Sequence, residues 1–328
     1  MRNNLNWHPA NVRAHRDLSA TVREFEIRPE GGVRPWRVGS HLDVRVMVNG
    51  HAETRSYSLV GLPGETAAAD AYRIAVKRAR PGRGGSSFMW SLETGNELLI
   101  GEPNNHFELG FAAPQFLLVA GGIGITPIVG MAQMLAARGA DVAMRYAVRS
   151  AAELIYADTL RQSLGERLKT FCSDAGERID LRAEIAALAP RAQLLACGPI
   201  TLLDALRDAW AHAGRAPADL RFETFGNSGR FEAQAFWVEV PRHGLRLQVP
   251  AERSLLDVLV EAGVDTLYDC KRGECGLCAV DVLRAEGQID HRDVFFSAHE
   301  KQSNQRLCAC VSRVHGGGLV LDSAYRPD

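Results

Sequence analysis

Three cysteines in one short segment are the residues best suited to hold a metal centre. Cys270, Cys275 and Cys278 are spaced Cys-x4-Cys-x2-Cys. This spacing is typical of the loop that supplies three thiolates to a plant-type [2Fe-2S] cluster. Gly273 and Gly276 lie between them and allow the positive φ angles and close backbone approach that such a loop requires. We therefore predict a two-iron, two-sulfur centre here.

Zinc and disulfide bonds are the two other common uses of clustered cysteines. A zinc ribbon has paired Cys-x2-Cys knuckles, and this sequence has a single Cys-x2-Cys. Disulfides are disfavoured because residues 1–5 do not begin a signal peptide, so we expect a reducing, cytoplasmic location. Neither alternative fits the spacing as well as an iron–sulfur cluster.

The fourth thiolate has two candidates, Cys308 and Cys310. Twenty-nine residues separate Cys278 from Cys308, a spacing common in this class of ferredoxin loop. Only one further ligand is needed, and the other cysteine would then be a small buried apolar residue. The spacing alone leaves both candidates open.

Length and composition limit the other possibilities. A chain of 328 residues is expected to form two or three domains. The net charge of −1 argues against a nucleic-acid partner. No run of eighteen or more apolar residues exists, so we expect no membrane span.

Residues 1–110 predict an antiparallel β-barrel, because short alternating segments are separated by Gly and Pro turns.

On the segment Arg55–Ser56–Tyr57–Ser58, an arginine for phosphate and a tyrosine for stacking would suit a planar, phosphorylated ligand. An ordinary edge strand is the alternative. Gly84, Gly85 and Ser86 follow in a basic, glycine-rich loop whose N–H groups would suit the phosphate of that ligand. A flexible basic loop is the alternative there.

Residues 111–228 predict a doubly wound α/β domain. The apolar strand 116–120 enters Gly121-Gly122-Ile123-Gly124-Ile125-Thr126-Pro127, with Thr126 as the expected helix N-cap and Pro127 at the first helical position. Strand, glycine loop and helix start would make a pyrophosphate site, although Pro127 replaces the third glycine of the usual fingerprint. Cys197 and Gly198 end a later strand at the edge where such sheets bind ligands.

Residues 229–328 have the order strand, strand, helix, cysteine loop, strand, which is compatible with a small α+β, β-grasp ferredoxin domain. Gly226–Gly229 is the expected linker before it. The whole chain is therefore predicted to be multidomain.

These motifs, in this order, resemble the phthalate dioxygenase reductase / vanillate demethylase reductase family over nearly the whole chain. The segments that carry the resemblance are 55–59, 82–86, 121–127, 197–199, 269–278, Asp290-His291-Arg292-Asp293, and Cys310-Val311-Ser312-Arg313 before 319–322. The resemblance implies an N-terminal FMN barrel, a central NADH domain and a C-terminal plant-type ferredoxin.

The resemblance also implies roles for individual residues. FMN would be bound by Arg55, Ser56, Tyr57, Ser58, Ala75, Val76, Lys77, Gly84, Gly85, Ser86 and Phe225. The nicotinamide cofactor would be bound by Gly122, Gly124, Arg149, Ser150, Asp174, Cys197 and Gly198. Thr126 and Cys197 would lie at the reacting atoms. The family's fourth cysteine precedes Val-Ser-Arg, which selects Cys310, and a turn about two residues longer between Leu283 and Asp290 would explain why counting points to Cys308.

The implied function is that of the reductase of a two-component Rieske-type oxygenase. By this resemblance, a flavin would accept a hydride from NADH and release electrons singly to the cluster, which would pass them to a separate terminal oxygenase. One alternative acceptor is a di-iron monooxygenase or free flavin. Another alternative is a cluster-based redox sensor without turnover. NADH is preferred over NADPH by resemblance only, since Arg149 could meet a 2′-phosphate.

Overall fold

The chain forms two compact units, one comprising Leu5–Glu223 and a second that contains Thr224–Asp328. The computed structural model describes residues 6–62, 70–79, 84–225, 229 and 231–322. Residues 82 and 83 of the glycine-rich loop and 226–228 of the expected linker lie outside the described residues. The predicted domain boundaries at 110/111 and 228/229 stay predictions.

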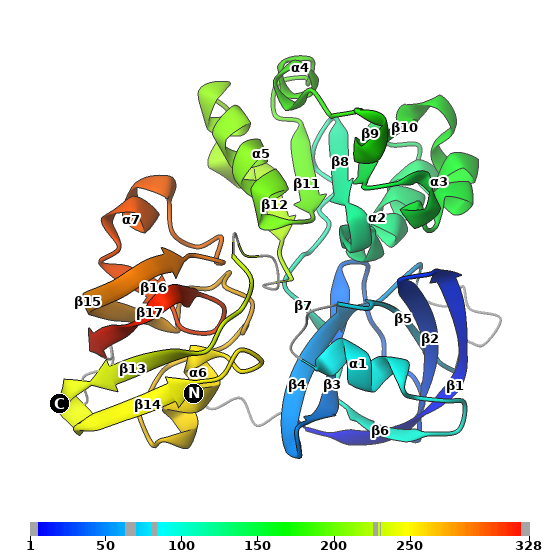
Figure 1. The fold of residues 1–328 in the computed structure, drawn as a ribbon. Coiled ribbons are helices and arrows are strands. Elements are labelled where there is room, and N and C mark those ends of the chain that lie inside the picture. Colours follow the sequence, from blue (N-terminus) through cyan, green and yellow to red (C-terminus); the bar gives the residue numbers. More distant parts are fainter. Residues whose placement is uncertain (1–5, 63–69, 80–83, 226–228, 230, 323–328) are drawn as a thin grey trace. The chain divides into compact units, whose positions relative to one another are not determined.

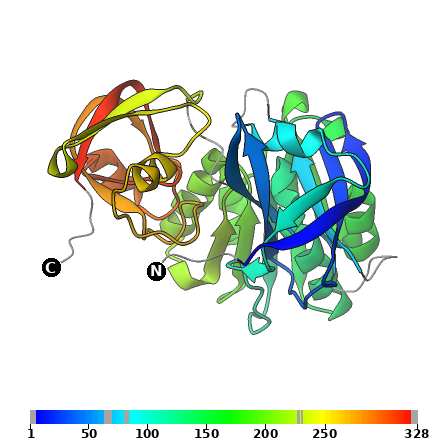
Figure 2. The ribbon, with the colours of Figure 1, turned by 90° about the horizontal axis from the view of Figure 1, so that it is seen from below.

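The first sheet is a seven-stranded antiparallel barrel with the order β4-β3-β6-β1-β2-β5, and β7 pairs with β3 (Figures 1 and 2). The edge strands β4 and β5 are joined by an antiparallel bridge between Leu59 and Ile74, which closes the barrel. Its elements are β1 (His8–Ser19), β2 (Val22–Pro29), β3 (Ser40–Val48), β4 (His51–Ser58), β5 (Tyr72–Lys77), α1 (Gly85–Trp90), β6 (Glu97–Ile100) and β7 (Asn104–Asn105).

Buried apolar and more exposed side chains alternate along strand β3 of this barrel, so that one face of the strand contributes to the core. On β3, Leu42, Val44 and Val46 are fully buried, and the residues between them are more exposed. The turn from β3 to β4 contains Asn49 and Gly50 at φ 50° and 81°, as the sequence predicts for a tight hairpin.

The second sheet is parallel, with the order β10-β9-β8-β11-β12. Helices α2 and α3 pack together, as do α4 and α5, and Figure 1 shows the two pairs on opposite sides of the sheet, the doubly wound arrangement that was predicted. The elements are β8 (Phe116–Gly121), α2 (Ile125–Ala137), β9 (Val142–Val148), α3 (Ala157–Leu164), β10 (Leu168–Cys172), α4 (Leu181–Ala186), β11 (Gln193–Cys197), α5 (Ile200–His212) and β12 (Leu220–Glu223).

The start of α2 differs from the prediction. A 3-10 turn, Gly122–Gly124, follows β8 directly, so the helix begins at Ile125 with Gly124 as the N-cap. Thr126 therefore lies inside the first turn, and its hydroxyl donates to the carbonyl of Ile123 at 3.0 Å. The prediction that Thr126 is the N-cap is wrong, because three glycines let the chain turn earlier than the hydroxyl does.

Helix α2 also packs closely on the barrel. A Cβ atom added at Gly130 would lie 2.1 Å from the carbonyl oxygen of Gly61, in the loop after β4. A Cβ at Gly39 would lie 2.1 Å from the carbonyl oxygen of Phe107 and 2.7 Å from Met131 of α2. Glycine is therefore required at these positions for the barrel and α2 to approach each other.

The third sheet has the order β14-β13-β17-β15-β16, with β13 parallel to β17. Its elements are β13 (Phe236–Val240), β14 (Leu245–Val249), α6 (Leu255–Glu261), β15 (Ala279–Asp290), α7 (Ala298–Ser303), β16 (Arg306–Cys308) and β17 (Arg313–Asp322). Ser254 caps α6 by accepting from the N–H of Asp257, as its sequence pattern predicts.

The expected turn between Leu283 and Asp290 is instead part of β15. The strand pairs with β17 through this region, and its register shifts between Val282 and Arg284 and again between Glu286 and Gln288. β-bulges therefore replace the predicted turn, because a bulge adds a residue to one strand without ending the strand. None of the helices in the described ranges is long and apolar enough to cross a bilayer.

Candidate functional site

The cysteine loop folds around one sulfur. Cys270 Sγ accepts backbone N–H groups from Arg272, Glu274 and Cys275, each at 3.4 Å. Three converging N–H dipoles favour the charged form of a thiolate. The thiolate is the form of cysteine that ligates iron.

The cysteines form two groups. The interaction with Cys270 lowers the pKa of Cys275 to about 6, and the same shared proton raises the pKa of Cys270. Hydrogen bonds from Cys308 and then Cys310 lower the pKa of Cys278 to about 4. Within the described residues no three His, Cys, Asp or Glu side chains already form a single metal site. Cys270 with Cys275, and Cys278 with a later cysteine, would supply two thiolates to each iron of a two-iron cluster.

The loop shape depends on its two glycines, as predicted. Gly273 and Gly276 have φ of 78° and 74°. A Cβ at Gly276 would lie 2.3 Å from the ring of Phe295, and one at Gly273 would lie 2.8 Å from the Cα of Asp293. The donor set, the glycine turns and the surrounding packing all fit a cluster. Because Cys278 interacts with both Cys308 and Cys310, the choice between them stays a prediction.

The two predicted phosphate-binding stretches of the barrel lie together. Arg55 on β4 crosses the start of α1, so that a Cβ added at Gly85 would lie 2.7 Å from Arg55 Nε. The Arg55 guanidinium also donates to Glu53 at 3.2 Å. Ser86 lies in the same turn, and its hydroxyl accepts the N–H of Ala79 at 3.1 Å. A cation and a glycine turn therefore meet at one place, as a phosphate site requires.

The other residues predicted to contact the flavin follow β4 and β5. Ser56 donates to Asp43 at 2.5 Å. Lys77 forms an ion pair with Glu153 at 3.0 Å, which joins the barrel to the turn after β9. On the same two strands, Tyr57 is half-buried, and Ser58, Ala75 and Val76 are buried. Phe225 lies on neither strand; it belongs to the second unit and is half-buried.

Sequence reasoning missed Glu223. This residue ends β12, is 1% exposed, and accepts a hydrogen bond from Ser58 on β4 at 3.4 Å. A carboxylate at the carboxyl end of a parallel strand could have identified it, because ligands bind at that edge. It links the strand that carries the predicted flavin contacts to the second sheet.

The predicted pyrophosphate loop meets the end of β11. A Cβ at Gly124 would lie 2.2 Å from the carbonyl oxygen of Cys197 and 2.8 Å from the nitrogen of Gly198. Gly122 has φ of 54°, and a Cβ there would meet nothing within 4 Å. Backbone groups from β8 and β11 therefore line an open position at the carboxyl edge. Cys197 and Thr126 are both buried beside it, at 0% and 2% exposure.

Arg149, Ser150 and Asp174 form a separate group at the same edge. Arg149 and Ser150 follow β9, and Asp174 follows β10. The guanidinium of Arg149 lies 3.5 Å from the carboxylate of Asp174, and the N–H of Asp174 donates to the carbonyl of Arg149 at 2.9 Å. Both side chains are more than half exposed, so they are accessible to a ligand.

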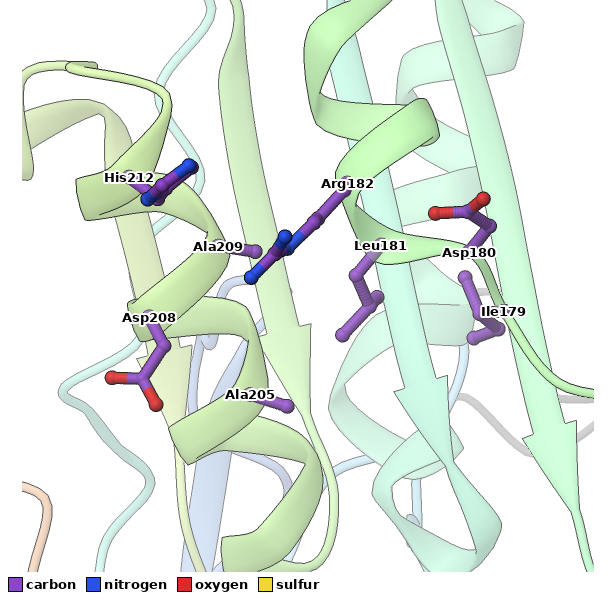
Figure 3. A pocket seen from close by; sticks show the side chains of 8 residues that line it. All are labelled: Ile179, Asp180, Leu181, Arg182, Ala205, Asp208, Ala209 and His212. Atoms are coloured by element: carbon purple, nitrogen blue, oxygen red, sulfur yellow. The ribbon is translucent and has the colours of Figure 1, made fainter.

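A pocket between α4 and α5 does not coincide with these groups (Figure 3). Arg182 extends from α4 towards Ala209 of α5. None of the predicted site residues lines this pocket. Its lining residues are Ile179, Asp180, Leu181, Arg182, Ala205, Asp208, Ala209 and His212.

Comparison with known proteins agrees with these features. Residues 238–315 match the family model described as 2Fe-2S iron-sulfur cluster binding domain. The chain is 38% identical to a putative toluene-4-sulfonate monooxygenase system reductase subunit of Comamonas testosteroni, over 96% of this chain and 98% of that protein. It is 37% identical to the heme-dependent oxidative N-demethylase beta subunit of Ectopseudomonas mendocina, over 95% of this chain and 97% of that protein.

A solved structure is similar over the same extent. Phthalate dioxygenase reductase, described as a modular structure for electron transfer from pyridine nucleotides to [2Fe-2S], superposes with a TM-score of 0.75 at 31% identity. The match covers 97% of this chain and 98% of that one. The chain therefore belongs to the phthalate dioxygenase reductase family, the iron–sulfur flavoprotein oxidoreductases that pass electrons through flavin and a [2Fe-2S] cluster to an oxygenase component.

Proposed function

We propose that this protein transfers electrons from NADH through FMN and its [2Fe-2S] cluster to a Rieske-type terminal oxygenase. The observation that carries the proposal is the cysteine loop: Cys270 Sγ accepts three backbone N–H groups, and Gly273 and Gly276 at positive φ bring Cys275 and Cys278 into the same loop, a donor set suited to a [2Fe-2S] centre. A centre ligated in this way accepts one electron at a time, which fits a donor to an iron-containing oxygenase.

FMN is proposed because Arg55 lies beside the glycine turn at Gly85, an arrangement that would suit a phosphate group. Arg55, Gly84, Gly85 and Ser86 would hold the phosphate, and Ser56, Tyr57 and Ser58 would continue along β4 beside the ring. Ala75, Val76 and Lys77 would line it from β5. Bound flavin would supply the exchange between two-electron and one-electron chemistry.

NADH is proposed because of the Arg149–Asp174 pair. Asp174 partly neutralises the guanidinium that a 2′-phosphate would need, and its carboxylate is suited to a ribose hydroxyl. Ser150 would lie beside the ribose, and Gly122, Gly124 and Gly198 would allow the close approach of the cofactor backbone. Thr126 and Cys197 would lie nearest the reacting atoms, buried from water.

A Rieske centre is a suitable acceptor on energetic grounds. Its histidine ligands raise its potential to about −150 mV or above, whereas plant-type clusters lie near −400 mV. Transfer from the ferredoxin cluster to a Rieske centre is therefore downhill. The resemblance to reductases of aromatic oxygenation systems supports the same acceptor.

Anaerobic reduction with NADH tests the internal route. We expect the flavin absorbance to bleach first and the cluster bands to follow, and an oxidised cluster beside a reduced flavin would contradict the route. NADH oxidation should then accelerate when a purified Rieske oxygenase and its substrate are added. Stimulation only by other acceptors would contradict the Rieske assignment while leaving the reductase activity intact.

A haem oxygenase is a second candidate acceptor, because the relative from Ectopseudomonas mendocina is described as part of a heme-dependent N-demethylase. The two candidate acceptors give different spectroscopic signals when they are reduced. Reduction of a haem partner changes its Soret band, and reduction of a Rieske partner produces the Rieske EPR signal. Direct comparison at equal partner concentration distinguishes them.

A further inference from the structure

A fully buried carboxylate, Asp293, lies against the cysteine loop. Asp293 is 0% exposed, and each of its carboxylate oxygens has a hydrogen-bond donor. One oxygen accepts the N–H of Phe296 at 2.9 Å, and the other accepts the hydroxyl of Ser312 at 3.3 Å. Asp293 is not among the residues proposed to bind FMN, NADH or iron.

Asp293 contacts both segments that supply cluster ligands, the loop 270–278 and the segment that contains Cys308 and Cys310. The N–H of Val294 donates to the carbonyl of Gly273 at 2.9 Å, and the Cα of Asp293 lies against Gly273, in the loop between the first two cysteines. Ser312, which donates to Asp293, lies two residues after Cys310. The carboxylate is therefore held between the loop and the segment that supplies the fourth thiolate.

Neighbouring groups favour the ionised form of this carboxylate. Burial alone would raise its pKa, but His291 and Lys301 outweigh burial and the pKa of Asp293 is lowered. His291 Nδ1 lies 3.7 Å from one oxygen and Lys301 Nζ lies 4.0 Å from the other. Lys301, on α7, also donates to the carbonyl of Asp293.

We propose that Asp293 is a positioning residue whose buried negative charge lowers the reduction potential of the [2Fe-2S] cluster, and that Lys301 partly offsets this charge. Reduction adds one electron to the cluster and makes it more negative. A fixed carboxylate nearby opposes that change, and does so strongly because burial limits screening by water. The inference concerns the cluster itself and does not depend on which oxygenase accepts its electrons.

The experiment measures the cluster midpoint potential in the full-length, cofactor-loaded protein, by anaerobic titration followed in the visible spectrum and by EPR. Asp293→Asn keeps the side-chain shape and removes the charge. At a fixed potential we expect its ratio of reduced to oxidised cluster to rise at least tenfold, equivalent to 59 mV for one electron. Lys301→Gln should shift the ratio in the opposite direction.

A matched control removes an exposed carboxylate from the same domain. Glu286 on β15 is 53% exposed and pairs with Arg284 at 3.3 Å, so Glu286→Gln should leave the potential unchanged. A loss of packing alone would lower iron content or move both test variants in the same direction. Unchanged potentials at full iron content, or shifts of the same sign, would overturn the proposal. If Asp293→Asn fails to retain iron, the test rests on Lys301→Gln. A midpoint potential in Lys301→Gln that is not lower than that of the parent protein would then overturn the proposal.

Discussion

Replacing Gly130 by alanine tests the contact between α2 and the barrel. In an isolated helix this change would stabilise by about 1 kcal/mol, because alanine is the better helix former. Here the added Cβ would lie 2.1 Å from the carbonyl oxygen of Gly61 and 3.1 Å from Val38. A backbone carbonyl cannot rotate away as a side chain can, so the two segments must separate by at least 0.9 Å to reach 3.0 Å.

Two effects follow from that displacement. Overpacking costs about 1–3 kcal/mol, which exceeds the gain in helix propensity, so the free energy of unfolding should fall by about 1 kcal/mol. The barrel is proposed to hold FMN, and the loop before α2 is proposed to hold NADH. A displacement of about 1 Å between two reactants can slow a reaction by about 100-fold. We therefore expect flavin reduction by NADH to slow by about 10- to 100-fold.

Stopped-flow flavin bleaching and urea unfolding measure these two quantities. Gly110→Ala is the control, because a Cβ at Gly110 would meet nothing within 4 Å. That variant should match the parent protein in both assays. A Gly130→Ala protein that is as stable as the parent and reduces its flavin at the same rate would refute the reasoning.

Three further predictions concern individual site residues. Asp174→Asn should raise kcat/KM for NADPH relative to NADH by about tenfold, about 1.4 kcal/mol, because Arg149 is released for a 2′-phosphate; unchanged selectivity in steady-state assays would contradict this. Cys310→Ser should abolish the cluster and Cys308→Ser should retain it, as measured by iron and sulfide per chain; the reverse pattern would make Cys308 the ligand. Glu223→Gln should slow flavin reduction by about tenfold or more without changing iron content, because it replaces the buried carboxyl group that accepts from Ser58, on the strand proposed to contact flavin; an unchanged rate in single-turnover measurements would exclude a role in hydride transfer.

Local patterns predicted most of the secondary structure and the fold class. Alternation along β3 and the apolar run of β8 depend on neighbours in the sequence, and both strands form as expected. The Asn49-Gly50 turn and the Ser254 cap are likewise local. The cysteine loop was recognisable because three ligands and both glycines lie within one segment.

The incorrect and missing predictions depend on contacts between distant segments. The register shifts of β15 arise from its pairing with β17, which no local pattern reports. Glu223 gains its significance only because Ser58, far away in the sequence, lies against it. Thr126 had the right residue type for an N-cap, but the preceding glycines started the helix earlier. Assignment of the individual cofactor contacts stays a prediction for the same reason.

The carboxyl edge of the second sheet, where we propose that the nicotinamide cofactor binds, contains one crowded position and one open pair of side chains, and redesign must treat them differently. Where β8 meets β11, Gly124 lies so close to the Cys197 carbonyl that even a methyl group would not fit. Arg149 and Asp174 are 79% and 58% exposed and have room to change. Efforts to alter coenzyme preference should therefore diversify the outer pair and leave the crowded backbone crossing intact, since substitutions at the crossing would disturb catalysis with every coenzyme alike.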